Sequence, residues 1–211
     1  MSDPFAADDG QTPLRPDEIH RLIPGHIRTR SELDRAEADN IGQSLGWLAR
    51  RRRSDLMSVP FVTQLHRAMC GAVWRWAGDF SREVNRRIGA DAQDIAPELT
   101  VLFDDMRYRI DHAAADADHV DLLAVFHHRL TKIHPFPNGN GRWARAMTDL
   151  LAERLGARPI RWGGDGDAGD SLHRVGDATR ERYLAALRNG DSYDLRPLET
   201  LLREWSEPVA A

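Results

Sequence analysis

The chain has 211 residues, a formal net charge of −4 and 41% hydrophobic residues, a composition typical of globular proteins and not of disordered or membrane chains. This length allows one well-packed domain with an extension, but hardly two full domains. No apolar run approaches the ~18 residues that a membrane span needs, and the acidic balance argues against nucleic acid as a partner.

The N-terminus and the single cysteine indicate the compartment. The stretch MSDPFAADDGQTP is acidic, contains prolines and lacks the apolar segment of a secretory signal, so residues 1–16 are predicted to be a disordered tail. Cys70 is the only cysteine, which excludes an internal disulfide framework and fits a reducing compartment. We therefore predict a cytoplasmic protein.

Helical signals dominate the chain from Ser31 onward. Ser31 with Asp34 three positions later resembles an N-cap signature and predicts a helix to about residue 50. Ser58 opens a second helix, which is predicted to end near Gly78. Periodic apolar positions predict further helices over about 97–113, 119–133, 141–156, 170–189 and 197–206.

One segment departs from this helical pattern. DFSREVNRRIG, residues 79–89, alternates loosely between apolar and polar residues and predicts a short β-hairpin or flap. The predicted fold class is therefore mainly α, with a hairpin flap.

The stretch HPFPNGNGRWAR, residues 134–145, joins the end of one predicted helix to the start of the next. Pro135 disfavours helical geometry at His134, which leaves this histidine at a helix end. Gly139 and Gly141 can adopt conformations that other residues avoid, and free N–H groups at a helix start bind phosphate oxygens. The stretch thus predicts an anion site beside a histidine that can take a proton near neutral pH.

Two arginines extend this anion site. Arg142 and Arg145 are three positions apart on one helix face, where their guanidinium groups could hold further phosphates. An ordinary turn between two helices would explain the glycines and asparagines alone. Packing gives no reason to add the histidine and both arginines, so a polyphosphate site is the favoured interpretation.

These residues resemble the signature of Fic/DOC (Fido) proteins, in which a histidine, a phenylalanine two positions on, an acidic residue, GNGR and a second arginine recur. RWAGDFSREVNRRIG resembles the family's flap, and RERYLAALRNGDSYDLRPLETLL resembles its C-terminal helices. The resemblance implies a Fic-fold helical bundle over 58–205, a helical extension over 17–57 and a C-terminal tail over 206–211. LIPGHIRTRSELDRAEADNI, together with HPFPNGNGR, resembles one bacterial branch, mobile mystery protein B.

The resemblance implies a protein adenylyltransferase that moves AMP from ATP to a Ser, Thr or Tyr hydroxyl of a target protein, with Mg²⁺ on the phosphates. His134 would deprotonate that hydroxyl, and Phe136 would anchor the loop. Arg142 would hold the β-phosphate and Arg145 the γ-phosphate. The implied catalytic residues are His134, Asn140 and Arg142, and the implied nucleotide-binding residues are Asn138, Gly139, Asn140, Gly141, Arg142 and Arg145. Flap residues Arg82, Val84 and Ile88 would align the target by strand-like pairing.

The sequence departs from the family pattern in two places. Asn138 stands where the family has Asp or Glu, the expected Mg²⁺ ligand, and a neutral amide oxygen predicts weaker or rearranged metal binding and reduced activity. Many Fic proteins are inhibited by a glutamate that precedes Gly or Asn and pairs with the second arginine. No glutamate here precedes either residue, so Glu37 as a substitute, a separate inhibitory partner, and no inhibition all stay open.

Two alternative functions also stay open. The protein could transfer another phosphoryl-containing group, although the intact Gly139 and Gly141 argue against the kinase-like Doc variant. It could instead be a non-catalytic module of a toxin–antitoxin-like pair, made inert by Asn138. The branch resemblance implies a small helix-turn-helix partner protein in either case.

Other signals have ordinary structural interpretations. His127 and His128 lack the spacing of a metal site and are predicted to be packed or hydrogen-bonded helix residues. DGDAGD, residues 165–170, is interpreted as a turn, because position twelve of a calcium loop there would be a glycine. Trp74 and Trp76 are predicted to pack in the core or at its rim.

Overall fold

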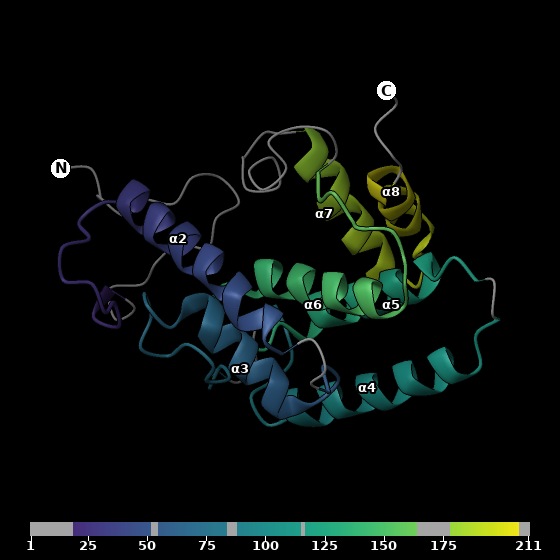
Figure 1. Ribbon diagram of the computed structural model, residues 1–211, viewed down its shortest axis with the longest axis horizontal. Helices are drawn as coiled ribbons and strands as arrows, with labels where there is room; N and C mark the ends of the chain where they lie inside the picture. Colours follow the sequence, from purple (N-terminus) through teal and green to yellow (C-terminus); the bar gives the residue numbers. More distant parts are fainter. Residues whose placement is uncertain (1–18, 52–54, 84–87, 115–116, 164–177, 207–211) are drawn as a thin grey trace.

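The computed structural model describes residues 19–51, 55–83, 88–114, 117–163 and 178–206. Over these ranges the chain is mainly helical, as predicted, and contains no strand apart from an isolated bridge between Leu22 and Trp74. The helices are α2 (Arg30–Ala49), α3 (Val59–Cys70), α4 (Ile95–Asp111), α5 (Val120–Ile133), α6 (Asn140–Arg154), α7 (Ala178–Asp191) and α8 (Arg196–Ser206) (Figure 1).

Helix α5 lies at the centre of the bundle. It packs against α6 along its length and also contacts α4, α7 and α8, while α2 packs on α3 at the N-terminal side of the molecule (Figure 1). The loop between α5 and α6 therefore has α2 and α3 on one side and the C-terminal helices on the other. No helix in the described ranges is both long and apolar enough to cross a membrane.

The start of α2 differs from the prediction by two residues. The N-cap is Thr29 and not Ser31, because the Thr29 hydroxyl accepts the N–H of Glu32 and the Glu32 carboxylate accepts the N–H of Thr29. This reciprocal capping box satisfies two backbone N–H donors at once. A cap at Ser31 with Asp34 would satisfy no more donors than that.

Helix α3 begins at the predicted cap but ends earlier than predicted. Ser58 caps it, and it stops at Cys70 instead of continuing to Gly78. The backbone beyond α3 bonds to the N-terminal segment: Ile23 donates to the carbonyl of Val73 at 2.8 Å, and Arg75 donates to the carbonyl of Arg21 at 3.0 Å. These long-range bonds replace the helical ones, so the prediction from periodicity was wrong over 71–78.

The remaining helices match their predictions to within two residues at most ends. For α7, the predicted start at residue 170 lies outside the described residues. The hairpin flap is not confirmed: its described residues are not in strands, and 84–87 lie outside the described ranges. Ala92, three residues beyond this segment, donates its N–H to the carbonyl of Glu83 within it at 3.2 Å.

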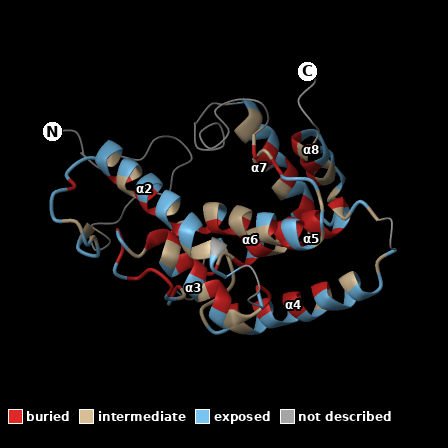
Figure 2. Cartoon of the chain, viewed as in Figure 1, coloured by how far each residue is buried: buried red, intermediate tan, exposed pale blue. Residues whose placement is uncertain are grey.

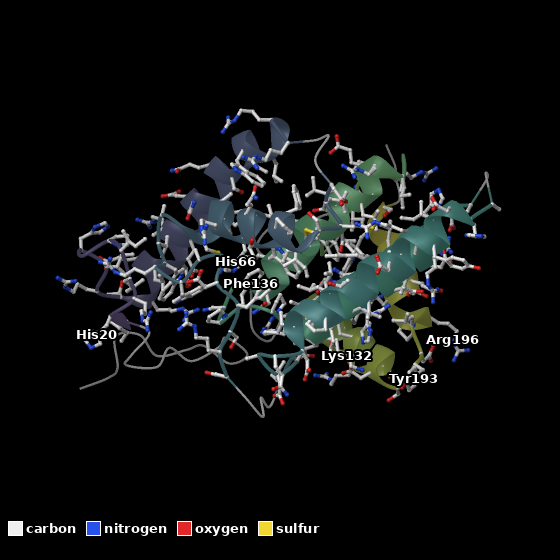
Figure 3. The ribbon with its side chains drawn as sticks, turned by 90° about the horizontal axis from the view of Figure 1, so that it is seen from below. His20, His66, Lys132, Phe136, Tyr193 and Arg196 are labelled. Atoms are coloured by element: carbon white, nitrogen blue, oxygen red, sulfur yellow. The ribbon has the colours of Figure 1, made fainter. Side chains whose placement is uncertain are left out.

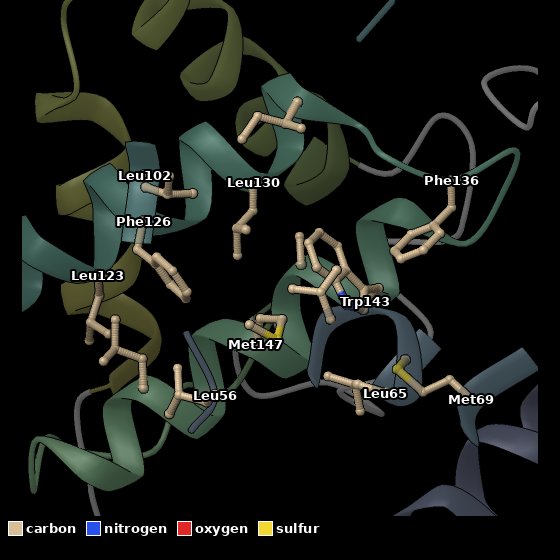
Figure 4. Packing of buried hydrophobic residues seen from close by; sticks show 14 of the residues in the cluster. Leu56, Leu65, Met69, Leu102, Leu123, Phe126, Leu130, Phe136, Trp143 and Met147 are labelled. Carbon is tan, nitrogen blue, oxygen red and sulfur yellow. The ribbon is translucent and has the colours of Figure 1, made fainter. Parts of the chain in front are cut away.

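The core lies where α3, α5 and α6 face one another. Buried residues line one face of α3 and of α6, whereas α5 is buried on most of its sides (Figure 2). Phe136 and Trp143 are fully buried and meet edge to face, with ring centroids 5.3 Å apart (Figure 4). Burying one such side chain contributes about 1.5–3 kcal/mol, so the core itself holds the α5–α6 loop in place.

Candidate active site

His134 ends α5 in a left-handed backbone conformation. Its φ is 48° and its ψ is 58°, and its N–H still donates to the carbonyl of Leu130 at 3.2 Å. A non-glycine residue adopts this conformation at some cost, and it persists only where the surroundings impose it. Here the backbone on both sides is held, because Ala90 donates to the carbonyl of Ile133 and Ser81 donates to the carbonyl of Pro135.

Of the two donors, Ser81 lies near the start of the flap segment, and Ala90 directly follows its end. The flap therefore attaches directly to the backbone on either side of His134. Arg82 and Ile88, which the sequence assigned to target docking, are exposed next to these attachment points. Val84, the third predicted docking residue, lies outside the described residues.

Asn140 clamps the loop that follows His134. Its side-chain amide donates to the carbonyl of Phe136 at 2.8 Å and accepts the N–H of Phe136 at 2.9 Å. The side chain is buried, and both of its ends are used inside the loop. Asn140 thus holds Phe136, the residue predicted to anchor the loop, through two hydrogen bonds. The backbone of Asn140 itself lies in the first turn of α6.

His66 of α3 packs against the same loop. Its ring stacks on Phe136, with centroids 3.6 Å apart and planes 9° from parallel (Figure 3). Burial lowers the pKa of His66 to about 3, so the ring is neutral at pH 7. Gly78 donates its N–H to Nδ1 at 3.0 Å, which leaves the proton on Nε2 to be donated to the carbonyl of Asn138 at 3.1 Å.

Gly139 caps α6 in a position that only glycine fits. Its φ is 77°, and a Cβ there would lie 3.3 Å from both the Cys70 sulfur and His66 Nε2. The first backbone bond within α6 is donated by Trp143 to the carbonyl of Gly139. The N–H groups of the preceding turn therefore have no partner within the helix, as the anion-site prediction requires.

The side chain of Asn138 folds back on this helix start. Its Oδ1 accepts the N–H of Gly139 at 2.7 Å. Asn138 and Asn140 carry the only side-chain oxygens of the stretch from His134 to Arg145, and both oxygens accept backbone N–H groups. No group of three or more metal-ligating acidic, histidine or cysteine side chains occurs in the described part of the chain. The residues present do not fit a protein-held Mg²⁺ site.

Arg142 forms an ion pair with the N-terminal helix. Its Nη2 donates to Oε2 of Glu37 in α2 at 2.6 Å, and Glu37 is 7% exposed. The other carboxylate oxygen of Glu37 accepts the indole N–H of Trp74 at 2.7 Å. In the family pattern an inhibitory glutamate pairs with the second arginine, whereas Glu37, which the sequence left open as a substitute, pairs with the first.

Arg145 follows Arg142 by three positions on the same face of α6. Its Nη1 lies 3.6 Å from the place that a Cβ on Gly141 would occupy, so the guanidinium folds back over the first turn of α6. Burial lowers the pKa of Arg145 from its ordinary value, and the Tyr183 hydroxyl of α7 is among the groups that oppose this shift. Both predicted phosphate-binding arginines thus border the same helix start.

Sequence reasoning missed several residues that hold these groups. His66, Trp74 and Tyr183 contact the site from elements distant in the chain, and no local pattern marks them. His127 and His128 are buried and hydrogen-bonded, as predicted. Trp74 and Trp76 are also buried, as predicted, and stack with centroids 5.0 Å apart.

Comparison with known proteins shows what this domain is similar to. Residues 56–152 match the Fic/DOC family. The N-terminal FIC domain of Bep8 from Bartonella sp. 1-1C superposes with a TM-score of 0.64 at 16% identity, over 90% of this chain and 97% of that one. BepC from Bartonella tribocorum, solved with bound AMPPNP, gives a TM-score of 0.60 at 16% identity over 93% of this chain and 100% of that one. The fold is the Fic fold, and residues 56–152 are similar to the Fic/DOC family.

Curated relatives are similar over the same region. Protein adenylyltransferase fic-1 of Caenorhabditis briggsae is 27% identical over 153 residues, which are 72% of this chain and 27% of the relative. Protein adenylyltransferase Fic of Aedes aegypti is 23% identical over 190 residues, 86% of this chain and 36% of the relative. The chain thus spans about a quarter to a third of the length of these relatives.

Proposed function

We propose that this protein is a Fic-type adenylyltransferase, which transfers AMP from ATP to a Ser, Thr or Tyr hydroxyl of a target protein. One observation carries the proposal: a histidine at the end of α5 and a glycine-capped start of α6 are joined by a loop that the core clamps in place. Two arginines border that helix start. The names of the curated relatives support the same activity.

His134 acts as the general base in this proposal. It takes the proton of the target hydroxyl, the hydroxyl oxygen forms a bond to the α-phosphorus of ATP, and the bond from that phosphorus to the bridging oxygen breaks. Pyrophosphate leaves with the electron pair of that bond. The N–H groups at the start of α6, around Gly139 and Gly141, stabilise the negative charge on the α-phosphate.

The remaining residues bind and orient the two reactants. Arg142 holds the β-phosphate and Arg145 the γ-phosphate, while Asn140 keeps the loop in shape. The flap around Arg82 and Ile88 aligns the target segment, a role supported by its attachment to the backbone beside His134. Mg²⁺ enters with the nucleotide's own phosphates, since the motif offers it no carboxylate.

Glu37 restrains this site in the absence of ligand. Its carboxylate accepts a hydrogen bond from the guanidinium of Arg142, so a β-phosphate has to displace this carboxylate. We therefore assign an inhibitory role to the extension, residues 17–57, acting on a transferase unit over 58–205. In keeping with the mobile mystery protein B branch, we also propose a bacterial, cytoplasmic setting and a small helix-turn-helix partner protein.

Labelling decides between transfer and its alternatives. The protein is incubated with host lysate and ATP labelled on the α-phosphate or on the γ-phosphate, and His134→Ala serves as the matched variant. We expect α-label on a target with the wild type, no label with His134→Ala, and nearly equal ATP affinity for the two proteins. Transfer of γ-label alone would identify a phosphotransferase. Absence of any nucleotide binding would identify an inert binding module.

A further inference from the structure

The carboxylate of Glu37 is held by two residues from different parts of the chain. Its Oε2 accepts a hydrogen bond from Arg142 Nη2 at 2.6 Å, and its Oε1 accepts the indole N–H of Trp74 at 2.7 Å. Both Glu37 and Trp74 are buried, so water hardly reaches the bond between them. A buried charge depends on such partners, because its desolvation is costly unless hydrogen bonds compensate for it.

The backbone that carries Trp74 is fixed by the segment before α2. Leu22 and Trp74 form an isolated antiparallel bridge, so the backbone on both sides of the tryptophan is hydrogen-bonded to residues 21 and 23. The Trp74 ring also stacks on that of Trp76, with centroids 5.0 Å apart. The indole N–H of Trp74 is therefore held in a fixed direction toward Glu37.

Helix α2 itself is clamped to the end of α3 close to Glu37. Asn40, three positions further along α2, donates its side-chain amide to the carbonyl of Ala68 at 3.0 Å and accepts the N–H of Ala72 at 2.8 Å. Neither bond involves α6 or the loop before it, so a nucleotide at the start of α6 leaves this clamp in place. The Glu37 carboxylate therefore leaves Arg142 by rotation of its side chain and not by movement of α2.

A bound phosphate and the Glu37 carboxylate exclude each other. An anion that binds the Arg142 guanidinium would lie beside a carboxylate in its present position, and the two negative charges would repel each other in a site shielded from water. The carboxylate has to rotate away, which breaks its bond to Trp74 as well as its bond to Arg142. Because a hydrogen bond to a charged acceptor is stronger than one between neutral groups, the Trp74 bond adds to the cost of this displacement.

We propose that Trp74 is a positioning residue that keeps Glu37 against Arg142 and so opposes the binding of nucleoside diphosphates and triphosphates. The inference rests on the proposed function, because that function places the β-phosphate at Arg142. The restraint then depends on two parts of the chain: α2 supplies the carboxylate, and Trp74 of the transferase unit holds it. A nucleoside monophosphate has no β-phosphate, so its binding does not meet this restraint.

The test compares the affinities of ATP, ADP and AMP by calorimetry. Trp74→Phe keeps an aromatic ring and removes the indole N–H, and Trp76→Phe is the matched control. Trp76 is also buried in the same stack, but its indole N–H has no hydrogen-bond partner among the described residues. We expect Trp74→Phe to strengthen ATP and ADP binding about fivefold and to change AMP binding by less than about twofold. Trp76→Phe should change all three by less than about twofold. In a Glu37→Gln background, Trp74→Phe should cause no further gain.

The outcomes separate this inference from the proposed function. Unchanged or weaker binding of ATP and ADP by Trp74→Phe, an equal gain for AMP, or an undiminished gain in the Glu37→Gln background would overturn the inference alone. A wild type that binds no nucleotide would overturn both. If Trp74→Phe does not fold, replacement of Trp74 with benzothienylalanine keeps the two fused rings without the N–H donor. That protein should show the same gain for ATP and ADP, and unchanged affinities there would overturn the inference.

Discussion

The two arginines of α6 occupy opposite electrostatic environments. Arg142 meets a carboxylate from the N-terminal helix at 2.6 Å, and a tryptophan holds that carboxylate in place. Burial instead lowers the pKa of Arg145, and the Tyr183 hydroxyl and Asp149 oppose this shift only in part. Desolvation raises the pKa of the Asp149 carboxyl to about 6, so this carboxyl is mostly ionised at pH 7.

This difference shows that two identical side chains, one helical turn apart, can differ in how strongly protein groups compete with a ligand for them. A phosphate must compete with Glu37 for Arg142. The N-terminal side of the site therefore restrains ligand binding.

The largest expected effect comes from removing Arg145. Arg145→Ala should weaken ATP binding about ten- to a hundredfold, the magnitude of one or two charge-assisted hydrogen bonds, and ADP binding much less. Arg142→Ala, the matched variant on the same helix face, should weaken both nucleotides and by less, because wild-type Arg142 must first leave Glu37. Calorimetry with both nucleotides measures this, and equal losses of ATP and ADP in Arg145→Ala would contradict the comparison.

Removing the restraint should strengthen binding. Glu37→Gln keeps the size of the side chain and its bond to Trp74 but removes the charge that holds Arg142, so affinity for ATP and ADP should rise about tenfold and AMP transfer should increase. The free energy of unfolding should fall, because a buried ion pair loses one member.

Asp39→Asn is the control for this variant. It makes the same charge change on the same helix at an exposed position, and should alter neither affinity nor transfer. Unchanged nucleotide binding in Glu37→Gln would show that Glu37 contributes only to stability.

Lowering the pH should reduce the free energy of unfolding through two buried histidines near the site. His66 and His127 each have a pKa of about 3 in the folded protein, below the ordinary value of 6.5. The unfolded chain therefore binds more protons, so their contribution is complete above pH 6.5 and is lost as pH falls toward 3, by about 1.4 kcal/mol per pH unit for each histidine. Urea unfolding between pH 7.5 and 4 measures this slope.

Single substitutions measure how much each histidine contributes to the dependence of unfolding free energy on pH. His66→Gln and His127→Gln should each flatten the dependence of unfolding free energy on pH by about 1 kcal/mol per unit. His20→Gln, at an exposed position, should leave the slope unchanged. A wild-type slope in both buried variants would rule out these histidines as the acid-sensitive groups.

The smallest effect is expected at the loop between the two sides. Asn138→Asp places a carboxylate at the helix start, where it can ligate Mg²⁺ on a bound nucleotide, and should strengthen Mg²⁺-dependent ATP binding about fivefold. Asn138→Ala is the control and should bind ATP no more tightly than the wild type. Weaker ATP binding by Asn138→Asp at saturating Mg²⁺ would show that its charge repels the phosphates instead.

The sequence by itself determined the parts of this protein that depend on neighbouring residues. The apolar spacing of α4 and α5, the stop imposed by Pro135 and the glycine-rich start of α6 all follow from contacts within a few positions. They were enough to predict a mainly helical fold and a histidine beside an anion site. Where a distant segment competed for backbone hydrogen bonds, as after Cys70, local pattern predicted the wrong helix end.

Only the tertiary structure decided what holds each functional group. The Glu37–Arg142 pair spans 105 positions, the contact of His66 with Asn138 spans 72, and that of His127 with Tyr183 spans 56. Such pairs leave no periodic trace, because their geometry depends on how helices cross and not on spacing along one of them. The motif therefore predicted two phosphate-binding arginines, and the contact of Glu37 from α2 with Arg142 restrained one of them.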